Sequence, residues 1–249
     1  MKTSMLVAAG LLAAAAGSAN AAAFLTYLDP AGAREVHYTA PVGNAAFGTL
    51  TTTAVVDLQI DLTDHGLGVI LFDNLTYSKT AKVGAVTMNG SSFNAEVYDC
   101  NFSYTDGANT VLSGSFGVGA DDQDGGDLFI NGLSGSISSN ADAVGGSLAY
   151  VFGPAAIQAG NGAATGLTLA QWLATASLAF GDAIDANWTL TGISPRPALL
   201  QGGNGQNFLQ NFDSNAAFSG TVAIVPTPGT AALAGLGLIM GLPRSRRKA

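Results

Sequence analysis

Hydrophobic and polar residues alternate most regularly at residues 54–62. Every second side chain there is apolar, and most of the intervening ones are acidic or amide groups. The apolar members are Ala54, Val56, Leu58, Ile60 and Leu62. A period of two with one polar face is typical of a strand in an antiparallel sheet that packs on one side. We therefore expect a strand here, with Asp57 and Asp61 on its solvent face.

Similar apolar or alternating runs recur at intervals of about ten residues, separated by turn-forming residues. We expect further strands at residues 68–72, 75–78, 83–88, 93–98, 110–118, 128–138, 147–152, 187–193 and 218–224. Asn89-Gly90, between two of these runs, is a typical hairpin turn. Residues 153–166 and 195–215 are rich in Gly, Asn, Pro and Gln, which predicts loops.

Residues 167–180 follow a different pattern. Leu169, Trp172, Leu173 and Ala176 recur at helical spacing, and Thr168 is placed to cap the first turn. We expect one short helix, although the β-branched and small residues that follow also suit a strand.

Many short strands with tight turns predict an all-β fold. We expect residues 24–225 to form an antiparallel β-sandwich, jelly-roll-like in its topology. A right-handed β-helix is the alternative, but the spacing of the glycines shows no fixed period, which a solenoid requires.

The N-terminus carries the pattern of a secretory signal peptide, assigned to residues 1–23. Lys2 precedes an apolar run at residues 5–16, and Ala19-Asn20-Ala21 or Ala21-Ala22-Ala23 offers the small-x-small site that a signal peptidase needs. The run is too short to cross the roughly 30 Å apolar thickness of a bilayer. An uncleaved anchor helix is the alternative.

The C-terminus, residues 226–249, has three parts. Pro226, Thr227, Pro228 and Gly229 precede a small, apolar stretch at residues 231–242. The chain then ends on a basic cluster, which consists of Arg244, Arg246, Arg247 and Lys248. By the positive-inside tendency the cluster should stay cytoplasmic and the body outside. A buried core helix is the alternative, but the basic cluster argues against it.

This order of motif, apolar stretch and basic end resembles the PEP-CTERM sorting domain, with Thr227 where that family usually has Glu. The resemblance covers about a tenth of the chain. It implies export, a transmembrane helix, cleavage by an exosortase near Pro226 to Pro228, and delivery to the envelope, surface or matrix. It also implies a link with exopolysaccharide and biofilm.

The charge of the body limits its partners. All seventeen acidic residues lie in residues 24–225 together with only four basic ones, a net charge of about −13. Such a surface repels phosphate backbones, so we expect no nucleic-acid partner.

Cys100 is the only cysteine, which rules out an internal disulfide and predicts a small buried side chain.

Candidate chemistry is sparse. Asp121, Asp122, Asp124 and Asp127 lie within seven residues among glycines, and their oxygens suit Ca²⁺. A solvated acidic turn is the alternative. Five tyrosines are candidates for a sugar-binding face, although half-buried strand positions are the alternative: Tyr27, Tyr38, Tyr77, Tyr98 and Tyr104. The histidines His37 and His65 lie in no catalytic motif.

These observations favour an exported, non-enzymatic protein of the cell surface or matrix. A calcium-dependent carbohydrate-binding module that holds polysaccharide is the alternative function. A hydrolase acting through Asp64 and His65 is a third hypothesis, and it has the least support from the sequence.

Overall fold

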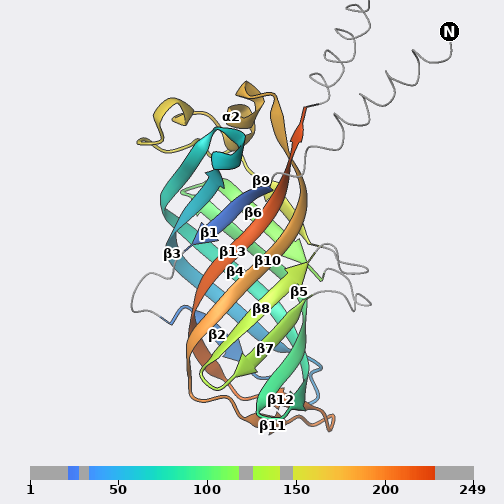
Figure 1. Cartoon of the computed structure of the whole chain (residues 1–249). Helices are drawn as coiled ribbons and strands as arrows, with labels where there is room; N and C mark the ends of the chain where they lie inside the picture. Colours follow the sequence, from blue (N-terminus) through green and yellow to red (C-terminus); the bar gives the residue numbers. More distant parts are fainter. Residues whose placement is uncertain (1–21, 28–33, 118–125, 141–147, 228–249) are drawn as a thin grey trace, which may run out of the picture.

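The computed structural model describes residues 22–27, 34–117, 126–140 and 148–227 (Figure 1). These residues form an all-β protein in which every paired strand is antiparallel, as the sequence predicts. The strands are β1 (Ala22–Tyr27), β2 (Val36–Thr39), β3 (Gly48–Leu62), β4 (Gly68–Asn89), β5 (Ser92–Asp106), β6 (Asn109–Phe116), β7 (Asp127–Asn131), β8 (Ser134–Asn140), β9 (Ala149–Phe152), β10 (Leu178–Ser194), β11 (Leu199–Gln201), β12 (Asn207–Leu209) and β13 (Phe212–Pro226).

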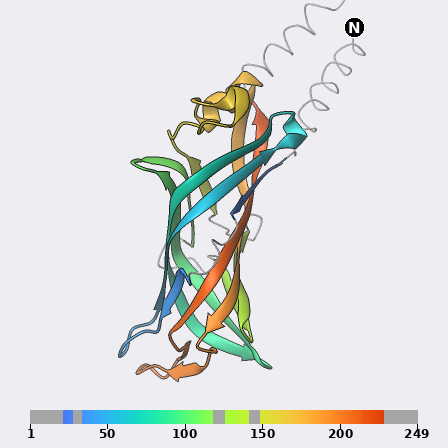
Figure 2. The same cartoon turned by 90° about the vertical axis from the view of Figure 1, so that its left-hand side faces the viewer.

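The main sheet closes on itself. Its pairings follow the cycle β1–β3–β4–β5–β7–β8–β10–β13 and return to β1. A closed sheet pairs the backbone groups that an edge strand would leave open to other chains. The strands cross obliquely around a tall, narrow body (Figures 1 and 2).

Two positions in the cycle are shared by short strands. Between β3 and β13, β1 fills one end and β2 the other. The long β5 pairs with β7 near its start and with β6 near its end, and β6 in turn pairs with β9. Side chains join β9 to β10, because Phe152 stacks on Phe180 with ring centroids 3.5 Å apart and the Tyr150 hydroxyl donates to the Asp185 carbonyl at 2.6 Å.

A cluster of aromatic rings packs among the aliphatic side chains inside the closed sheet. The fully buried Trp188 lies 5.1 Å from the Phe102 ring and 5.0 Å from the Phe218 ring, measured between centroids. Its indole N–H donates to the Tyr77 hydroxyl at 2.8 Å. Tyr104 stacks on Tyr77 with centroids 4.8 Å apart. Edge-on and offset contacts of this kind add stability beyond the area buried.

Both ends of the described body lie at one end of the closed sheet, here called the chain-end pole (Figure 1). β1 begins where β13 ends, with Ala22 opposite Ala223. The same pole carries the short turn η1 (Thr63–His65), the turn η2 (Gly162–Ala164) and the helix α2 (Leu169–Thr175). The hairpin of β11 and β12 marks the opposite end, here called the hairpin pole.

The helix predicted near residues 167–180 is confirmed in its first half. Thr168 accepts from the Gln171 N–H at 3.2 Å, and the Gln171 side chain accepts from the Thr168 N–H at 2.9 Å, which is a capping box. Leu169 and Leu173 are buried. The helix ends at Thr175 and the chain enters β10 at Leu178.

Two side-chain amides attach the segment that precedes η2 to β4 at the chain-end pole. Asn161 accepts from the Leu71 N–H at 2.8 Å and donates to the Leu71 carbonyl at 2.9 Å. Gln158 does the same with Asp73, at 2.7 and 3.0 Å. The two amides therefore satisfy backbone N–H and C=O groups near the start of β4, as a neighbouring strand would.

Several sequence predictions were wrong in detail. The three strands expected within residues 68–88 are one strand, β4, in which Asn74 forms an irregularity at φ 57°. Residues 128–138 are not one strand, because Gly132 at φ 66° turns β7 back into β8. The predicted loop at 195–215 contains the β11–β12 hairpin. The main strands form one closed sheet rather than the two packed sheets of a sandwich, and its antiparallel pairings do not fit a β-helix.

Candidate functional site

The predicted calcium ligands fall mostly outside the described residues. Asp121, Asp122 and Asp124 lie there, so their positions are not part of the structure described. Asp127 is the first residue of β7 and is exposed on the outer face of the sheet. Within the described residues, no cluster of three or more His, Cys, Asp or Glu side chains is placed to hold a metal ion.

The sorting motif starts where the folded body ends. Pro226 is the last residue of β13 and is exposed, and the Thr227 N–H donates to the Ser177 carbonyl at 3.0 Å. Pro228, Gly229 and the basic residues Arg244, Arg246, Arg247 and Lys248 lie outside the described residues. In the part of the chain that is described, no helix has both the length and the apolar character needed to cross a bilayer.

Four of the five tyrosines named as candidates for a sugar-binding face are instead interior residues of strands. Tyr27, Tyr38, Tyr77 and Tyr104 are buried inside the closed sheet. Burial raises the pKa of Tyr77 and Tyr104 well above the usual value and that of Tyr38 to about 12. These phenols stay neutral at physiological pH and act as core residues. Only Tyr98 lies on the outer face.

Cys100 is fully buried, as expected, and burial raises the pKa of its thiol to about 12. A thiol with so high a pKa forms little thiolate and is a poor nucleophile. Close to it lies Lys79, a buried lysine that the sequence analysis missed. The alternation of β4 places Tyr77, Lys79 and Ala81 on the inner face, so the period-two pattern was the signal available for finding it.

The two histidines lie in different parts of the sheet. His37 on β2 faces Asp213 on β13, with Nδ1 2.7 Å from the carboxylate, and both side chains are exposed. His65 lies in η1 beside Asp64 at the chain-end pole. The exposed position of the His37–Asp213 pair gives no enclosed site for a reaction.

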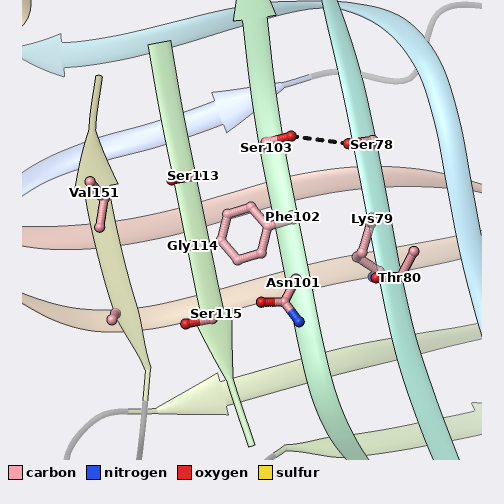
Figure 3. Close-up of a pocket in the computed structure, with 11 residues that line it drawn as sticks. Ser78, Lys79, Thr80, Asn101, Phe102, Ser103, Ser113, Gly114, Ser115 and Val151 are labelled. Carbon is pink, nitrogen blue, oxygen red and sulfur yellow. Dashed lines mark hydrogen bonds between the residues drawn. The ribbon is translucent and has the colours of Figure 1, made fainter. Parts of the chain in front are cut away.

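A groove lined by small polar residues crosses the outer face of β4, β5, β6 and β9 (Figure 3). We call it the hydroxyl groove, and its volume is about 330 Å³. One row of register partners runs across the four strands through Ser78, Ser103, Ser113 and Val151. The next row runs through Thr80, Asn101, Ser115 and Ala149.

The hydroxyl groove is shallow because its side chains are short. The Ser78 and Ser103 hydroxyl oxygens lie 3.0 Å apart and share a hydrogen bond. Beneath the groove, Gly114 leaves room for the Phe102 ring, which lies against it in the core (Figure 3). The groove therefore offers hydroxyl and amide groups in a regular array, and Phe102, the aromatic residue among its described lining residues, directs its ring into the core.

A second groove lies on the outer face near the hairpin pole, and its volume is about 530 Å³. We call it the acidic groove, because Glu96 and Asp127 line it and none of its described lining residues is basic. These two residues are direct register partners on β5 and β7. Like charges directly opposite one another destabilise a sheet, so this arrangement has an energetic cost in the free protein.

Aromatic rings form one side of the acidic groove. Phe47, 41 % exposed, meets Tyr98 edge-on with ring centroids 5.2 Å apart. The Tyr98 hydroxyl donates to Glu96. Partial burial, followed by this hydrogen bond, raises the pKa of Tyr98 to about 12, so the phenol remains a donor at neutral pH. Gly84 allows this ring position, since a Cβ there would lie 3.1 Å from the Tyr98 ring.

Two loops form the rim of the acidic groove. The Gly203 N–H donates to the Gly43 carbonyl at 2.9 Å, which fastens the β11–β12 loop to the segment that leads into Phe47. Gln206 reaches the groove from that loop, and Asn94 reaches it from β5. The groove thus combines two carboxylates, two amides and an exposed ring, none of which the sequence analysis placed together.

A scan of the chain against protein-family models finds no match, and searches of curated proteins and of solved structures find none either.

Proposed function

We propose that this chain is an exported, non-enzymatic protein of the cell envelope, surface or extracellular matrix, processed through signal peptidase and an exosortase-type enzyme and linked to exopolysaccharide and biofilm. The observation that carries the proposal is the position of the two ends. β1 begins at Ala22, opposite Ala223 of β13, and β13 ends at Pro226, so the described body extends between the predicted signal peptide and the predicted sorting tail.

The pairing of β1 with β13 favours one of the two signal-peptidase sites. Ala22 and Ala23 pair with Ala223 and Val222, and Ala23 is fully buried. Cleavage after Ala23 would remove both residues from β1, whereas cleavage after Ala21 keeps the strand whole. We therefore expect the mature chain to begin at Ala22 rather than at Phe24.

The positions of the two ends also define the orientation of a membrane-tethered body relative to the bilayer. With leader and tail both leaving at the chain-end pole, a membrane-held intermediate directs that pole towards the bilayer and the hairpin pole away from it. Pro226 is exposed at the very end of β13, which supports access of a processing enzyme to the motif at the margin of the sheet.

Mass spectrometry of the mature termini tests this proposal. We expect an N-terminus at Ala22 and a C-terminus between Pro226 and Gly229 in protein from the envelope or medium. The comparison is a chain truncated after Val225. If that chain reaches the same compartment in the same amount as the wild type, the sorting role of the tail is refuted.

A second candidate function is carbohydrate binding, with calcium at Asp121, Asp122, Asp124 and Asp127 as the predicted cofactor. The hydroxyl groove favours it, because rows of hydroxyl and amide groups match the hydrogen-bonding groups of a sugar chain. A glycan array probes the binding. A chelator should lower the melting temperature if calcium is bound, and an unchanged midpoint removes calcium from the proposal.

A further inference from the structure

The acidic groove combines a pair of carboxylates with an exposed aromatic ring. The export proposal does not account for this combination, and the hydroxyl groove lacks it among the described residues. The two carboxylates of the acidic groove belong to Glu96 on β5 and Asp127 on β7, which are register partners. The lysine beside its aromatic side is Lys82, which is already paired with Asp99. Lys82 donates to Asp99 at 2.5 Å and lies 6.0 Å from the Phe47 ring centroid. A positively charged group bound beside Glu96 and Asp127 would lower the repulsion between these two register partners.

We propose that the acidic groove binds an amine-bearing glycan, in which the ammonium groups of glucosamine-type residues meet Glu96 and Asp127 while a sugar ring stacks on Phe47. This inference deepens the carbohydrate-binding function proposed above and rests on it. It names the class of sugar and the residues that select it.

Each part of the groove matches a part of such a ligand. The exposed Phe47 ring provides an apolar face for the C–H surface of a sugar and a favourable surface for a cation. The amides of Asn94 and Gln206 suit ring hydroxyls, since each both donates and accepts. An acidic sugar would place its carboxylate beside Glu96 and Asp127, whereas a neutral sugar would form hydrogen bonds with them but no charge-assisted contact.

The shape and position of the groove also favour a chain-like ligand. It is open along the outer face, and its floor is kept low by the small residues Gly84, Ala85 and Ala95. It lies near the hairpin pole, away from the ends of the described body (Figure 1). A polymer outside a membrane-held body therefore reaches the groove without meeting the bilayer.

The test uses calorimetric titration of the purified full chain at about pH 5.5, where amines are protonated and most carboxylates are ionised. The two ligands are a β-1,4-linked pentamer of glucosamine and the matching pentamer of N-acetylglucosamine, which differ in the charge at each nitrogen. We expect the glucosamine pentamer to bind about tenfold more tightly or better, and its affinity to fall as salt is raised.

The variant Glu96→Gln with Asp127→Asn removes both charges and keeps the hydrogen-bonding shape. It should lose about tenfold or more in affinity for the glucosamine pentamer, because two charge-assisted contacts are lost. The matched control is Asp73→Asn with Asp182→Asn, which changes the net charge equally through exposed residues near the start of β4 and the start of β10. It should stay within about twofold of the wild type.

The outcomes separate the proposals. Equal affinity for the two pentamers, or equal losses in the groove variant and the control, overturns the amine selection. Binding of the N-acetyl pentamer alone overturns it as well, and leaves carbohydrate binding intact. Binding of neither pentamer overturns this inference while the export proposal stands, since export is measured on mature termini in cells.

Discussion

The buried Lys79 gives the sharpest prediction about the stability of the fold. Its ammonium lies 4.1 Å from the centroid of the Trp188 ring and makes no hydrogen bond to a described residue. Burial lowers the pKa of Lys79 from 10.5 to about 8. One pKa unit corresponds to about 1.4 kcal/mol, so keeping this lysine charged in the folded state costs roughly 3 kcal/mol at pH 7.

The change Lys79→Met keeps an unbranched side chain of similar length and removes the charge. The lost cation–π contact with Trp188 is worth about 1 to 2 kcal/mol, which offsets part of the gain. We expect the variant to be about 1 to 2 kcal/mol more stable at pH 7. For a chain of this size that raises the melting temperature by about 2 to 8 °C.

The pH dependence supplies an independent check. Between pH 8 and 10.5 the unfolded chain keeps the proton on Lys79 that the folded chain has lost, so stability rises with pH. Above about pH 9 Cys100 opposes this rise, because its folded pKa is raised to about 12 and the unfolded thiol ionises first. Wild-type stability should therefore increase by about 1 kcal/mol from pH 8 to 9, and the Met variant should lack this increase.

Urea unfolding followed by tryptophan fluorescence at pH 7, 8 and 9 measures both effects. Lys82→Met is the matched control, since Lys82 is on the outer face of the same strand and pairs with Asp99 at the surface. It should change stability by less than about 1 kcal/mol. A less stable Lys79→Met protein, together with flat wild-type stability from pH 8 to 9, refutes the assignment of a desolvated charge.

Three further changes test the packing around the sheet. Thr168→Ala removes the cap of α2 and should cost about 1 kcal/mol in urea unfolding; an unchanged midpoint would show that the capping box is dispensable. Asn161→Ala breaks two bonds to the β4 backbone, so hydrogen exchange should accelerate at that end of β4 and nowhere else in the sheet. Gly114→Ala forces a Cβ into the Phe102 ring and should cost about 2 kcal/mol, whereas Ser113→Ala on the outer face should be nearly neutral; equal effects would contradict the packing described.

The sequence by itself determined the secondary structure type and the faces of the strands. The alternation at residues 54–62 predicted that Val56, Leu58 and Ile60 face the core, and all three are buried. Thr168 predicted the start of α2, and Asn89-Gly90 predicted the turn between β4 and β5. These signals are local, because side-chain period, caps and turns depend on neighbouring residues.

Only the tertiary structure decided how the strands pair. Local alternation does not distinguish a sandwich from a closed sheet, because both have one apolar and one polar face on each strand. Closure brings Trp188 to Tyr77, which is 111 residues away in the sequence. It also buries the Lys79 ammonium against the Trp188 ring. It also brings Phe47 beside Tyr98 and places Glu96 opposite Asp127. Such contacts depend on the register between distant strands, which no short stretch of sequence contains.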